Sequence, residues 1–295
     1  MIWLNQYNRQ VITMNIRTLD RAQVLRLLPD RDPYGHKGTF GKVLLLCGSK
    51  GFTGAAYLAA MGALRTGAGL VFLGVPDCIY QIEAVKLNEP VVFPLPDEEG
   101  KLSRDAIPEI LSRLPQMDAV LIGCGLGQSE GTLDVVNAVL EHARCPVVVD
   151  ADGINVLAEH KHLLRGRPYP TILTPHDGEF LRFGGSIGTD RMASAAAFSR
   201  EWNCILLLKG HRTCITDGCE GYINHTGNPG MAVGGSGDVL AGMIVALLGQ
   251  GISHLEAAAC AAWLHGAAGD LCAEEIGQYG MLPTDMLNRI PRLLK

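Results

Sequence analysis

The chain has 295 residues, 47% of them hydrophobic and 19% charged, and its formal net charge is −5. This composition predicts a folded globular protein, and the negative charge without any basic run argues against a nucleic-acid partner. No apolar run is long enough to span a bilayer, and residues 1–13 lack the pattern of a signal peptide, so we expect no membrane association.

Nine cysteines are scattered along the chain, and no two of them have the CxxC spacing. Several, including Cys47, Cys145 and Cys204, fall within predicted strands or helices, where a free cysteine behaves as a small hydrophobic residue. The pattern indicates neither a disulfide framework nor a zinc site. We therefore expect a reducing compartment, the cytoplasm.

Short apolar runs alternate with helical patterns along the chain. Residues 1–16 have no clear period and are expected to form an N-terminal arm, and residues 17–28 a short helix. Residues 89–100, rich in proline and acidic side chains, are expected to be a loop. Strands are expected at 43–47, 70–75, 119–122, 146–149, 171–173 and 204–208, with a hairpin at 214–216 and 222–224. Further helices are expected at 55–66, from Pro76 onward, and at 103–114, 132–142, 191–202, 239–248, 255–272 and 284–294.

The expected strands are continuous apolar runs, not runs in which apolar and polar residues alternate. Such strands, separated by helices, predict a central, mostly parallel sheet covered by helices on both faces, which is a three-layer α/β/α fold. No linker, repeat or change of composition divides the chain. Residues 17–295 are therefore expected to form a single domain.

Unusual motifs follow several of the expected strands. In open α/β sheets, ligands bind beyond the carboxyl ends of the strands. We therefore expect these motifs to meet at one edge of the sheet. They occupy residues 48–54, 123–127, 150–155, 174–179 and 209–213.

A glycine-rich segment precedes the expected helix 239–248. Gly234, Gly235, Ser236 and Gly237 leave the backbone accessible, and the first turn of a helix offers unpaired N–H groups and the positive end of its dipole. Asp238 lies in that first turn. An acid there can simply cap the helix, but beside a glycine-lined anion site it is better explained as a base next to a phosphate.

Two familiar phosphate-binding motifs are absent in their usual form. Residues 35–42 resemble a Walker loop, but they precede a strand and their spacing is wrong. The glycines at 123, 125 and 127 lack the third-glycine spacing of a dinucleotide fingerprint, so a classical Rossmann site is not expected. Taken alone, Gly125 and Gly127 fit a close approach to a ligand and an ordinary tight turn equally well.

His176 and Glu179 stand three residues apart at an expected helix start. Glu179 can be a capping-box acid, or it can hold Mg²⁺ indirectly through water. His176 lies on a polar loop anchored by proline, which favours a functional role. By contrast, we expect His160 and His162 to be solvated, and His142, His254 and His265 to be structural.

The segment Lys209–Thr213 offers cations and a hydroxyl group directly after an apolar strand. These groups suit the phosphates or the ribose of a nucleotide. The alternative is a basic β-turn, which is common. Its place after a strand and upstream of the glycine-rich segment favours the nucleotide role.

With these residues laid out, the chain resembles the ADP/ATP-dependent NAD(P)H-hydrate dehydratase family, a branch of the ribokinase-like superfamily. The resemblance extends from about residue 19 to the C-terminus, and its motifs together are highly specific. They are Lys37-Gly-Thr-Phe-Gly-Lys-Val43, Gly54-Ala-Ala-Tyr-Leu-Ala-Ala60, Arg65-Thr-Gly-Ala-Gly-Leu-Val71, Asp150-Ala-Asp-Gly-Ile-Asn155, Thr174-Pro-His-x-Gly-Glu179, Leu208-Lys-Gly-x-x-Thr213 and Asn228-Pro-Gly-Met-Ala-x-Gly-Gly-x-Gly-Asp-Val-Leu-Ala-Gly242.

The resemblance implies a ribokinase-like fold and the dehydration of (S)-NADHX and (S)-NADPHX, with ADP as co-substrate and with Mg²⁺. It implies that the hydrated dinucleotide contacts Ala55, Gly125, Gly127, His176 and Asp238. It implies a nucleotide site made by Lys209, Gly210, His211, Arg212, Thr213, Gly234, Gly235, Ser236 and Gly237. The chain departs from the family pattern at Asp177, where proline is usual, and at Val233 and Ser236, where threonines are usual.

In the mechanism that the resemblance implies, Asp238 is the general base, and Glu179 holds Mg²⁺ through water. The resemblance further implies a homo-oligomer, a tetramer, and a companion NAD(P)HX epimerase on another chain, because no such domain is expected before residue 17. Two rivals are a small-molecule kinase of the same fold, such as a thiazole or sugar kinase, and a catalytically silent nucleotide-binding regulator. The presence of Asp238 argues against the silent regulator.

Overall fold

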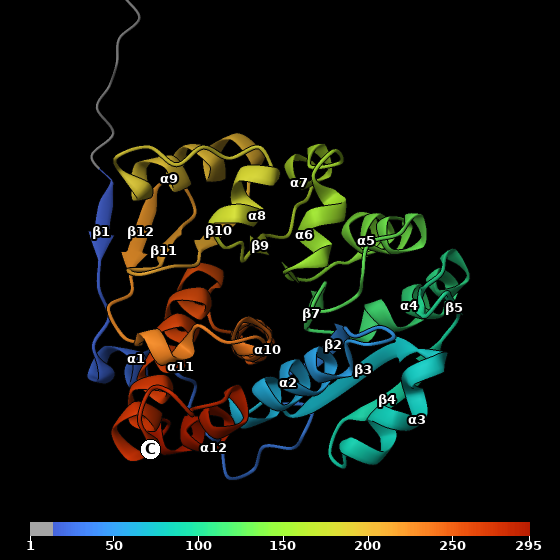
Figure 1. Ribbon diagram of the computed structural model, residues 1–295, viewed down its shortest axis with the longest axis horizontal. Helices are drawn as coiled ribbons and strands as arrows, with labels where there is room; N and C mark the ends of the chain where they lie inside the picture. Colours follow the sequence, from blue (N-terminus) through green and yellow to red (C-terminus); the bar gives the residue numbers. More distant parts are fainter. Residues whose placement is uncertain (1–13) are drawn as a thin grey trace, which may run out of the picture.

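The structure, a computed structural model, describes residues 14–295 (Figure 1). Most of the predicted N-terminal arm, residues 1–13, lies outside the described residues. The predicted boundary at residue 16 falls inside a short strand, and the division into an arm and a single domain stays a prediction.

One large sheet organises the described residues. Its strands are β1 (Asn15–Arg17), β2 (Lys42–Leu46), β3 (Leu70–Pro76), β4 (Val91–Leu95), β7 (Ala119–Ile122), β8 (Val147–Val149), β9 (Thr171–Leu173), β10 (Ile205–Leu208), β11 (Cys214–Thr216) and β12 (Glu220–Ile223). They lie in the order β1-β12-β11-β10-β9-β8-β7-β2-β3-β4. All neighbours pair in parallel except β10 with β11 and β11 with β12, so the predicted mostly parallel sheet is confirmed. A separate small hairpin joins β5 (Asp97–Glu98) and β6 (Lys101–Leu102).

Helices cover both faces of the sheet, as the three-layer prediction requires (Figure 1). On one face lie α1 (Arg21–Leu27), α2 (Thr53–Arg65), α3 (Asp77–Lys86), α10 (Ser236–Gly249), α11 (His254–Ile276) and α12 (Pro283–Leu293). On the other lie α4 (Ile107–Arg113), α5 (Glu130–His142), α6 (Asp152–Leu157), α7 (His162–Arg165), α8 (Asp177–Arg182) and α9 (Arg191–Trp202). Short 3-10 turns complete the chain: η1 (Arg104–Ala106), η2 (Leu114–Gln116) and η3 (Pro229–Met231).

The central strands are apolar throughout because both of their faces are buried. In β2, Leu45 packs into the core beneath α2 and α10, whereas Leu44 and Leu46 pack into the core beneath α5. All three leucines are fully buried. The side-chain alternation of a strand therefore feeds two separate hydrophobic cores, which a continuous apolar run makes possible.

Two strands of the large sheet escaped prediction, β1 and β4, and they are its two outermost strands. β4 occupies part of the segment expected to be a loop, and it tolerates Pro94 because an edge strand need not donate every backbone hydrogen bond. Arg17, expected to start a helix, belongs to β1 instead. The helix α1 begins four residues later, where Asp20 and Gln23 form a capping box.

The helices α2 and α10 pack unusually closely. A methyl group at Gly62 would lie 2.6 Å from the Val239 carbonyl oxygen, and one at Gly242 would lie 2.1 Å from the Ala59 carbonyl oxygen. Both distances are shorter than any real carbon–oxygen contact, so only glycine allows the two backbones to approach this far. The contact fixes α10 against α2.

None of the helices within residues 14–295 is both long and apolar enough to cross a membrane.

Candidate active site

The predicted meeting of loops at one edge of the sheet is confirmed. The strands β10, β9, β8, β7 and β2 are consecutive parallel neighbours, so their carboxyl ends lie side by side. The first turn of α10 reaches the same edge: a methyl group at Gly237 would lie 3.3 Å from Lys209 Nζ and 3.9 Å from Asp150 Oδ2. We call this cluster at the carboxyl edge, made by Cys124, Asp150, Lys209 and Asp238, the carboxyl-edge cluster.

The start of α10 is built for an anion. Gly235 caps the helix with a left-handed backbone, φ +96°, a conformation that disfavours other residues. Within residues 14–295, no carbonyl accepts a hydrogen bond from the N–H groups of Gly234, Gly235, Gly237 or Asp238. These free donors and the positive end of the helix dipole favour a phosphate at this point.

A buried ion pair lies beneath this helix start. Asp150 is 1% exposed, and its Oδ1 accepts a hydrogen bond of 2.9 Å from Lys209 Nζ. Its second oxygen, Oδ2, lies 3.7 Å from the Cys124 thiol. Glu179 Oε2 lies 3.8 Å from Lys209 Nζ, so two carboxylates share one lysine. The two carboxylates balance the burial of Lys209 and raise the pKa of its ammonium group, which stays charged.

The predicted base, Asp238, belongs to this cluster, and its pKa is higher than that of an ordinary aspartate. Burial and the negative charge of Asp150 raise its pKa to about 7, and Cys124 and Lys209 oppose that shift. The Cys124 Sγ and one carboxylate oxygen each of Asp150 and Asp238 all lie within 4.8 Å of one another. A carboxylate with a pKa close to neutral can both take and return a proton at physiological pH. The geometry therefore suits the predicted role of Asp238.

Backbone strain marks the same edge. Ala151, which directly follows Asp150, has φ +47° and ψ −117°, a conformation that is rare for any residue with a side chain. Asp152 follows, and its Oδ2 accepts a hydrogen bond of 2.9 Å from the N–H of Gly127. Strained residues at the edge of a sheet are frequent at functional sites because the surrounding structure must hold them in place.

His176 has a structural role in addition to any contact with a ligand. Its Nδ1 accepts hydrogen bonds from the N–H groups of Gly178 and Glu179, at 3.0 and 3.2 Å, and so caps α8. In return Glu179 Oε2 accepts from the N–H of His176 at 2.9 Å. The capping box that we considered for Glu179 is thus present. Only the Nε2 side of the half-exposed His176 ring remains for a ligand.

The same contacts decide how Glu179 could serve a metal ion. Its carboxylate is almost fully buried, Oε2 is used by the helix cap, and Oε1 lies 3.5 Å from His176 Nε2. This arrangement does not fit direct coordination, which needs an accessible oxygen. It fits the predicted indirect role, in which water lies between the carboxylate and Mg²⁺.

The residues predicted to hold the dinucleotide meet in part. A methyl group at Gly125 would lie 2.7 Å from the Ala55 Cβ, so these two positions are in contact across the loop and the start of α2. Gly127 lies beside the Lys101 side chain, at 3.0 Å by the same measure. Ala55 and Gly125 form a wall that adjoins the carboxyl-edge cluster in the chain, because Gly125 directly follows Cys124.

The loop Lys209–Thr213 contributes unequally to the site. Only Lys209 reaches the carboxyl-edge cluster, whereas the side chains of His211 and Arg212 are exposed and make no ion pair within the described residues. The Thr213 hydroxyl donates to the Gly210 carbonyl at 3.0 Å and closes the turn. The structure therefore shows the turn that we considered as the alternative, with the lysine directed inward.

One departure from the family pattern, Asp177 at the start of α8, is connected to this loop through Arg191. Asp177 forms an ion pair with Arg191, and the Arg191 guanidinium donates to the Lys209 carbonyl at 2.6 Å. The acid thus ties α8 to the backbone of the residue that pairs with Asp150. A second departure, Val233, lacks the hydroxyl group of the usual threonine. It is 38% exposed and lies beside the glycine segment.

Sequence reasoning missed two members of the site. Asp150 and Cys124 stood in motifs after strands, but nothing in the sequence places Asp150 on Lys209, 59 residues away. His265, which was expected to be structural, is buried, and its Nε2 lies 3.3 Å from the Ser236 hydroxyl in the glycine segment. The helical phase of α11, which buries position 265 next to α10, is the signal in the sequence for this contact.

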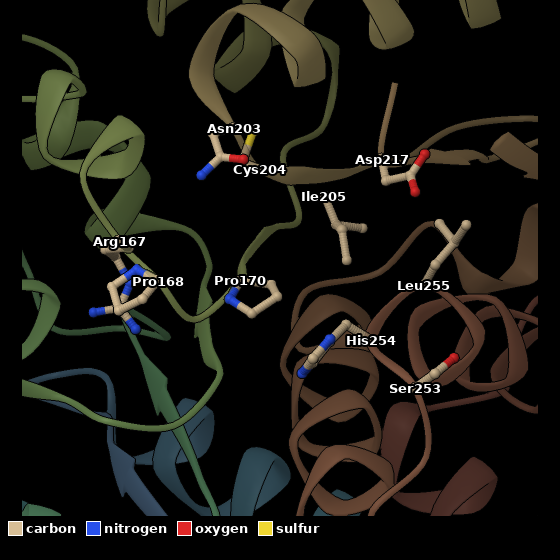
Figure 2. A pocket seen from close by; sticks show the side chains of 10 residues that line it. All are labelled: Arg167, Pro168, Pro170, Asn203, Cys204, Ile205, Asp217, Ser253, His254 and Leu255. Atoms are coloured by element: carbon tan, nitrogen blue, oxygen red, sulfur yellow. The ribbon is translucent and has the colours of Figure 1, made fainter. Parts of the chain in front are cut away.

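Two hollows in the surface lie away from this site. One, of about 350 Å³, lies near the amino ends of β9 and β10. Figure 2 shows the side chains of Arg167, His254 and Asp217 around it. The second, of about 460 Å³, lies beside β1 and α1. Neither is lined by a predicted site residue. Charge and backbone geometry, and not the size of a cavity, identify the candidate site.

The comparisons with known proteins agree with this geometry. A family model described as NAD(P)H-hydrate dehydratase matches residues 43–292. The chain is 47% identical over 288 residues to a bifunctional NAD(P)H-hydrate repair enzyme of Moorella thermoacetica, a match that covers 95% of this chain and 54% of that protein. It is 35% identical over 288 residues to an ADP-dependent (S)-NAD(P)H-hydrate dehydratase of Bacillus subtilis, covering 96% and 99% of the two chains. The chain spans about half the length of the bifunctional relatives.

Solved structures give the same result. The ADP/ATP-dependent NAD(P)H-hydrate dehydratase from Bacillus subtilis, co-crystallised with ATP and Mg²⁺, superposes with a TM-score of 0.82 at 32% identity and covers 95% of this chain and 98% of that one. A ribokinase-like superfamily protein from Enterococcus faecalis superposes with a TM-score of 0.84 at 26% identity, covering 99% and 98%. The predicted ribokinase-like fold is confirmed.

Proposed function

The chain belongs to the NAD(P)H-hydrate dehydratase family, and from that premise we propose that it is an ADP-dependent hydro-lyase. Its substrates are (S)-NADHX and (S)-NADPHX, the forms of NADH and NADPH whose nicotinamide ring has taken up water. The products are NADH or NADPH together with AMP and phosphate. The reaction repairs a damaged metabolite.

The observation that carries this proposal is the position of Asp238. Its carboxylate has a pKa of about 7 and lies in the first turn of α10, where four N–H groups are free to bind a phosphate. A base and a phosphate site within one helix turn suit the transfer of a phosphoryl group to a hydroxyl. The phosphoryl-transfer step then needs no proton acceptor other than Asp238.

In the proposed reaction, Asp238 accepts the proton of the ring hydroxyl while the hydroxyl oxygen forms a bond to the terminal phosphorus of ADP. The bond from that phosphorus to the bridging oxygen breaks, and AMP is released. The ring nitrogen then supplies the electron pair that expels the phosphorylated oxygen as phosphate. The released phosphate then takes a proton from the neighbouring ring carbon, which restores the double bond.

The residues around Asp238 have distinct tasks in this scheme. Free N–H groups at Gly234, Gly235 and Gly237 bind the oxygens of the transferred phosphoryl group, whose charge they stabilise. The Lys209 ammonium group supplies a positive charge at the same point and is held there by Asp150. The wall at Ala55 and Gly125 lies where the hydrated ring would pack.

Mg²⁺ belongs to the proposal as the ion that accompanies the nucleotide. It neutralises phosphate charge when bound. Glu179 would hold it through water, because the Glu179 oxygens already serve the α8 cap. A tetrameric assembly, a companion NAD(P)HX epimerase and a cytoplasmic location also stay predictions. The nine free cysteines support a reducing compartment.

We expect ADP to support turnover better than ATP. The test incubates the full chain with NADHX and either nucleotide at equal concentration, with Mg²⁺, and follows the return of reduced-nicotinamide absorbance at several nucleotide concentrations. Faster turnover with ATP would contradict the ADP preference while leaving the dehydratase proposal intact. No return of absorbance with either nucleotide, together with phosphorylation of a hydroxyl group on a thiazole or a sugar, would favour the small-molecule kinase.

A further inference from the structure

His265 is a buried ionisable residue that the proposed mechanism does not use. It lies on α11, which packs beside α10 (Figure 1), and its side chain is 7% exposed. Its Nε2 lies 3.3 Å from the Ser236 hydroxyl, between Gly235 and Gly237. Burial lowers the pKa of His265 to about 4, so the ring is neutral at pH 7 and has one donor and one acceptor nitrogen.

The glycine segment has few other ways to keep its shape. Gly234, Gly235 and Gly237 carry no side chains, and glycine restricts its own backbone less than any other residue. Within residues 14–295, the Ser236–His265 contact is the one hydrogen bond that a side chain of residues 233–237 makes. Among the side chains of residues 233–237, Ser236 is therefore the one that can hold the anion site by a hydrogen bond.

The same helix holds the approach to the glycine segment at several points. Asp270 accepts hydrogen bonds from the Gly227 N–H and from the Asn228 side chain, at 2.9 and 3.0 Å. The Thr226 hydroxyl donates to the Trp263 carbonyl at 2.9 Å. One face of α11 thus holds the chain from residue 226 onward, and His265 makes the last contact before Asp238.

We propose that His265 is a positioning residue: through the Ser236 hydroxyl it fixes the first turn of α10, and with it the N–H groups that bind the transferred phosphoryl group. The inference rests on the proposed function. Displacement of a reacting group by about 1 Å can cost about a hundredfold in rate, so a single hydrogen bond under the anion site can have a large effect.

The test is a double-mutant cycle of His265→Leu and Ser236→Ala, measured by kcat, by the ADP dissociation constant from calorimetry and by Tm. Each single variant should lower kcat by about ten- to a hundredfold and weaken ADP about two- to tenfold. The double variant should be no worse than the worse single variant, because both remove the same contact. His265→Gln, which can present an amide nitrogen near the same point, should restore most of the lost kcat.

The matched control is His254→Ala, in the first turn of the same helix and about three turns away, where burial also lowers the pKa of the imidazole. It should leave kcat and ADP affinity unchanged. Losses that multiply in the double variant, or a His265→Leu variant with wild-type kcat, would overturn the inference. If His265→Leu does not fold, Ser236→Ala and His265→Gln decide: a wild-type kcat in Ser236→Ala overturns the inference.

The cycle also separates the two proposals. A wild-type protein that binds ADP but does not dehydrate NADHX contradicts the proposed function. The His265 inference is then judged on the ADP dissociation constants of the same four proteins. Coupled losses of affinity in Ser236 and His265 variants support it, and independent losses overturn it.

Discussion

Charged side chains are buried both at the amino ends and at the carboxyl ends of the central strands, which we call the amino edge and the carboxyl edge. The partners that offset the buried charge differ between the two. At the amino edge, Arg167 is 7% exposed, and its guanidinium donates to the carbonyl groups of Leu140 and Cys145. At the carboxyl edge, Asp150 is 1% exposed and pairs with Lys209, which in turn lies 3.8 Å from Glu179. At the amino edge the buried charge is thus hydrogen-bonded to backbone carbonyl groups, whereas at the carboxyl edge it is paired with side chains of opposite charge.

The difference separates a structural charge from a reactive one. Backbone carbonyl groups do not titrate, so Arg167 holds the ends of two segments together whatever is bound elsewhere. The carboxyl-edge cluster contains groups whose charges depend on one another, and Asp150 helps to raise the pKa of Asp238 to about 7. Mutual dependence lets a ligand or a proton change the whole cluster. Variants at the two edges should therefore fail in different assays.

The largest effect is expected at the carboxyl edge. Asp238→Asn keeps the shape and hydrogen-bonding capacity of the side chain but cannot accept a proton at neutral pH. We expect turnover to fall by about 10²–10⁴-fold, with the ADP dissociation constant little changed because the N–H groups of α10 remain. Steady-state kinetics with NADHX and calorimetry with ADP measure the two quantities. Near wild-type turnover would contradict the role of Asp238 as the general base.

Two pH measurements sharpen this prediction. Wild-type turnover should rise with pH through about 7, as Asp238 loses its proton. The pKa of Asp238 is higher in the folded than in the unfolded chain, so its ionisation above pH 7 opposes folding. Asp238→Asn should therefore resist urea at pH 8 at least as well as the wild type. A variant that is less stable at pH 8 would indicate a structural role for the carboxylate.

At the amino edge, Arg167→Met should show the opposite behaviour. Methionine keeps an unbranched apolar stem like that of arginine, but it removes the donors to the carbonyl groups of Leu140 and Cys145. We expect the free energy of unfolding to fall by about 2–4 kcal/mol, measured by urea denaturation, while the kcat of the folded protein stays near wild type. A large loss of kcat in a folded variant would mean that the two edges are coupled.

The smallest effect is expected at His176, which combines features of both edges. His176→Ala should lose the α8 cap and about 0.5–2 kcal/mol of stability. It should also weaken NAD(P)HX binding if the ring contacts the dinucleotide, with ADP affinity near normal. His176→Asn is the matched control because asparagine retains the cap. A His176→Asn variant with wild-type Tm but weakened NAD(P)HX binding would support the contact between the ring and the dinucleotide. Wild-type values of both Tm and NAD(P)HX affinity would show that His176 only caps α8.

The fold was largely predictable because its central strands must be apolar on both faces. The two strands of the large sheet that escaped prediction, β1 and β4, are its outermost strands, where that requirement is relaxed. β1 is the exposed segment Asn-Ile-Arg, and β4 contains Pro94. A sequence carries little signal for a strand that is defined mainly by its neighbour.

The site was predictable where the chain itself supplies the geometry, as in the glycine segment and its following helix. It was not predictable where distant segments create the chemistry. The pairing of Asp150 with Lys209 follows from the order of β8, β9 and β10 in the sheet, and no spacing encodes it. His176 illustrates a further limit, since a histidine acceptor in a capping box has the same sequence signature as a ligand contact.

The close contact between α2 and α10 also limits how the chain can evolve. Ala55 lies on α2 and Asp238 on α10, so Gly62 and Gly242 set the spacing between the proposed dinucleotide contact and the proposed base. A mutation to any larger residue at either glycine must displace a whole helix, because the obstructing atoms belong to the backbone. Selection can therefore keep this spacing or lose it in one step, but point mutations at these positions offer no gradual series of intermediates.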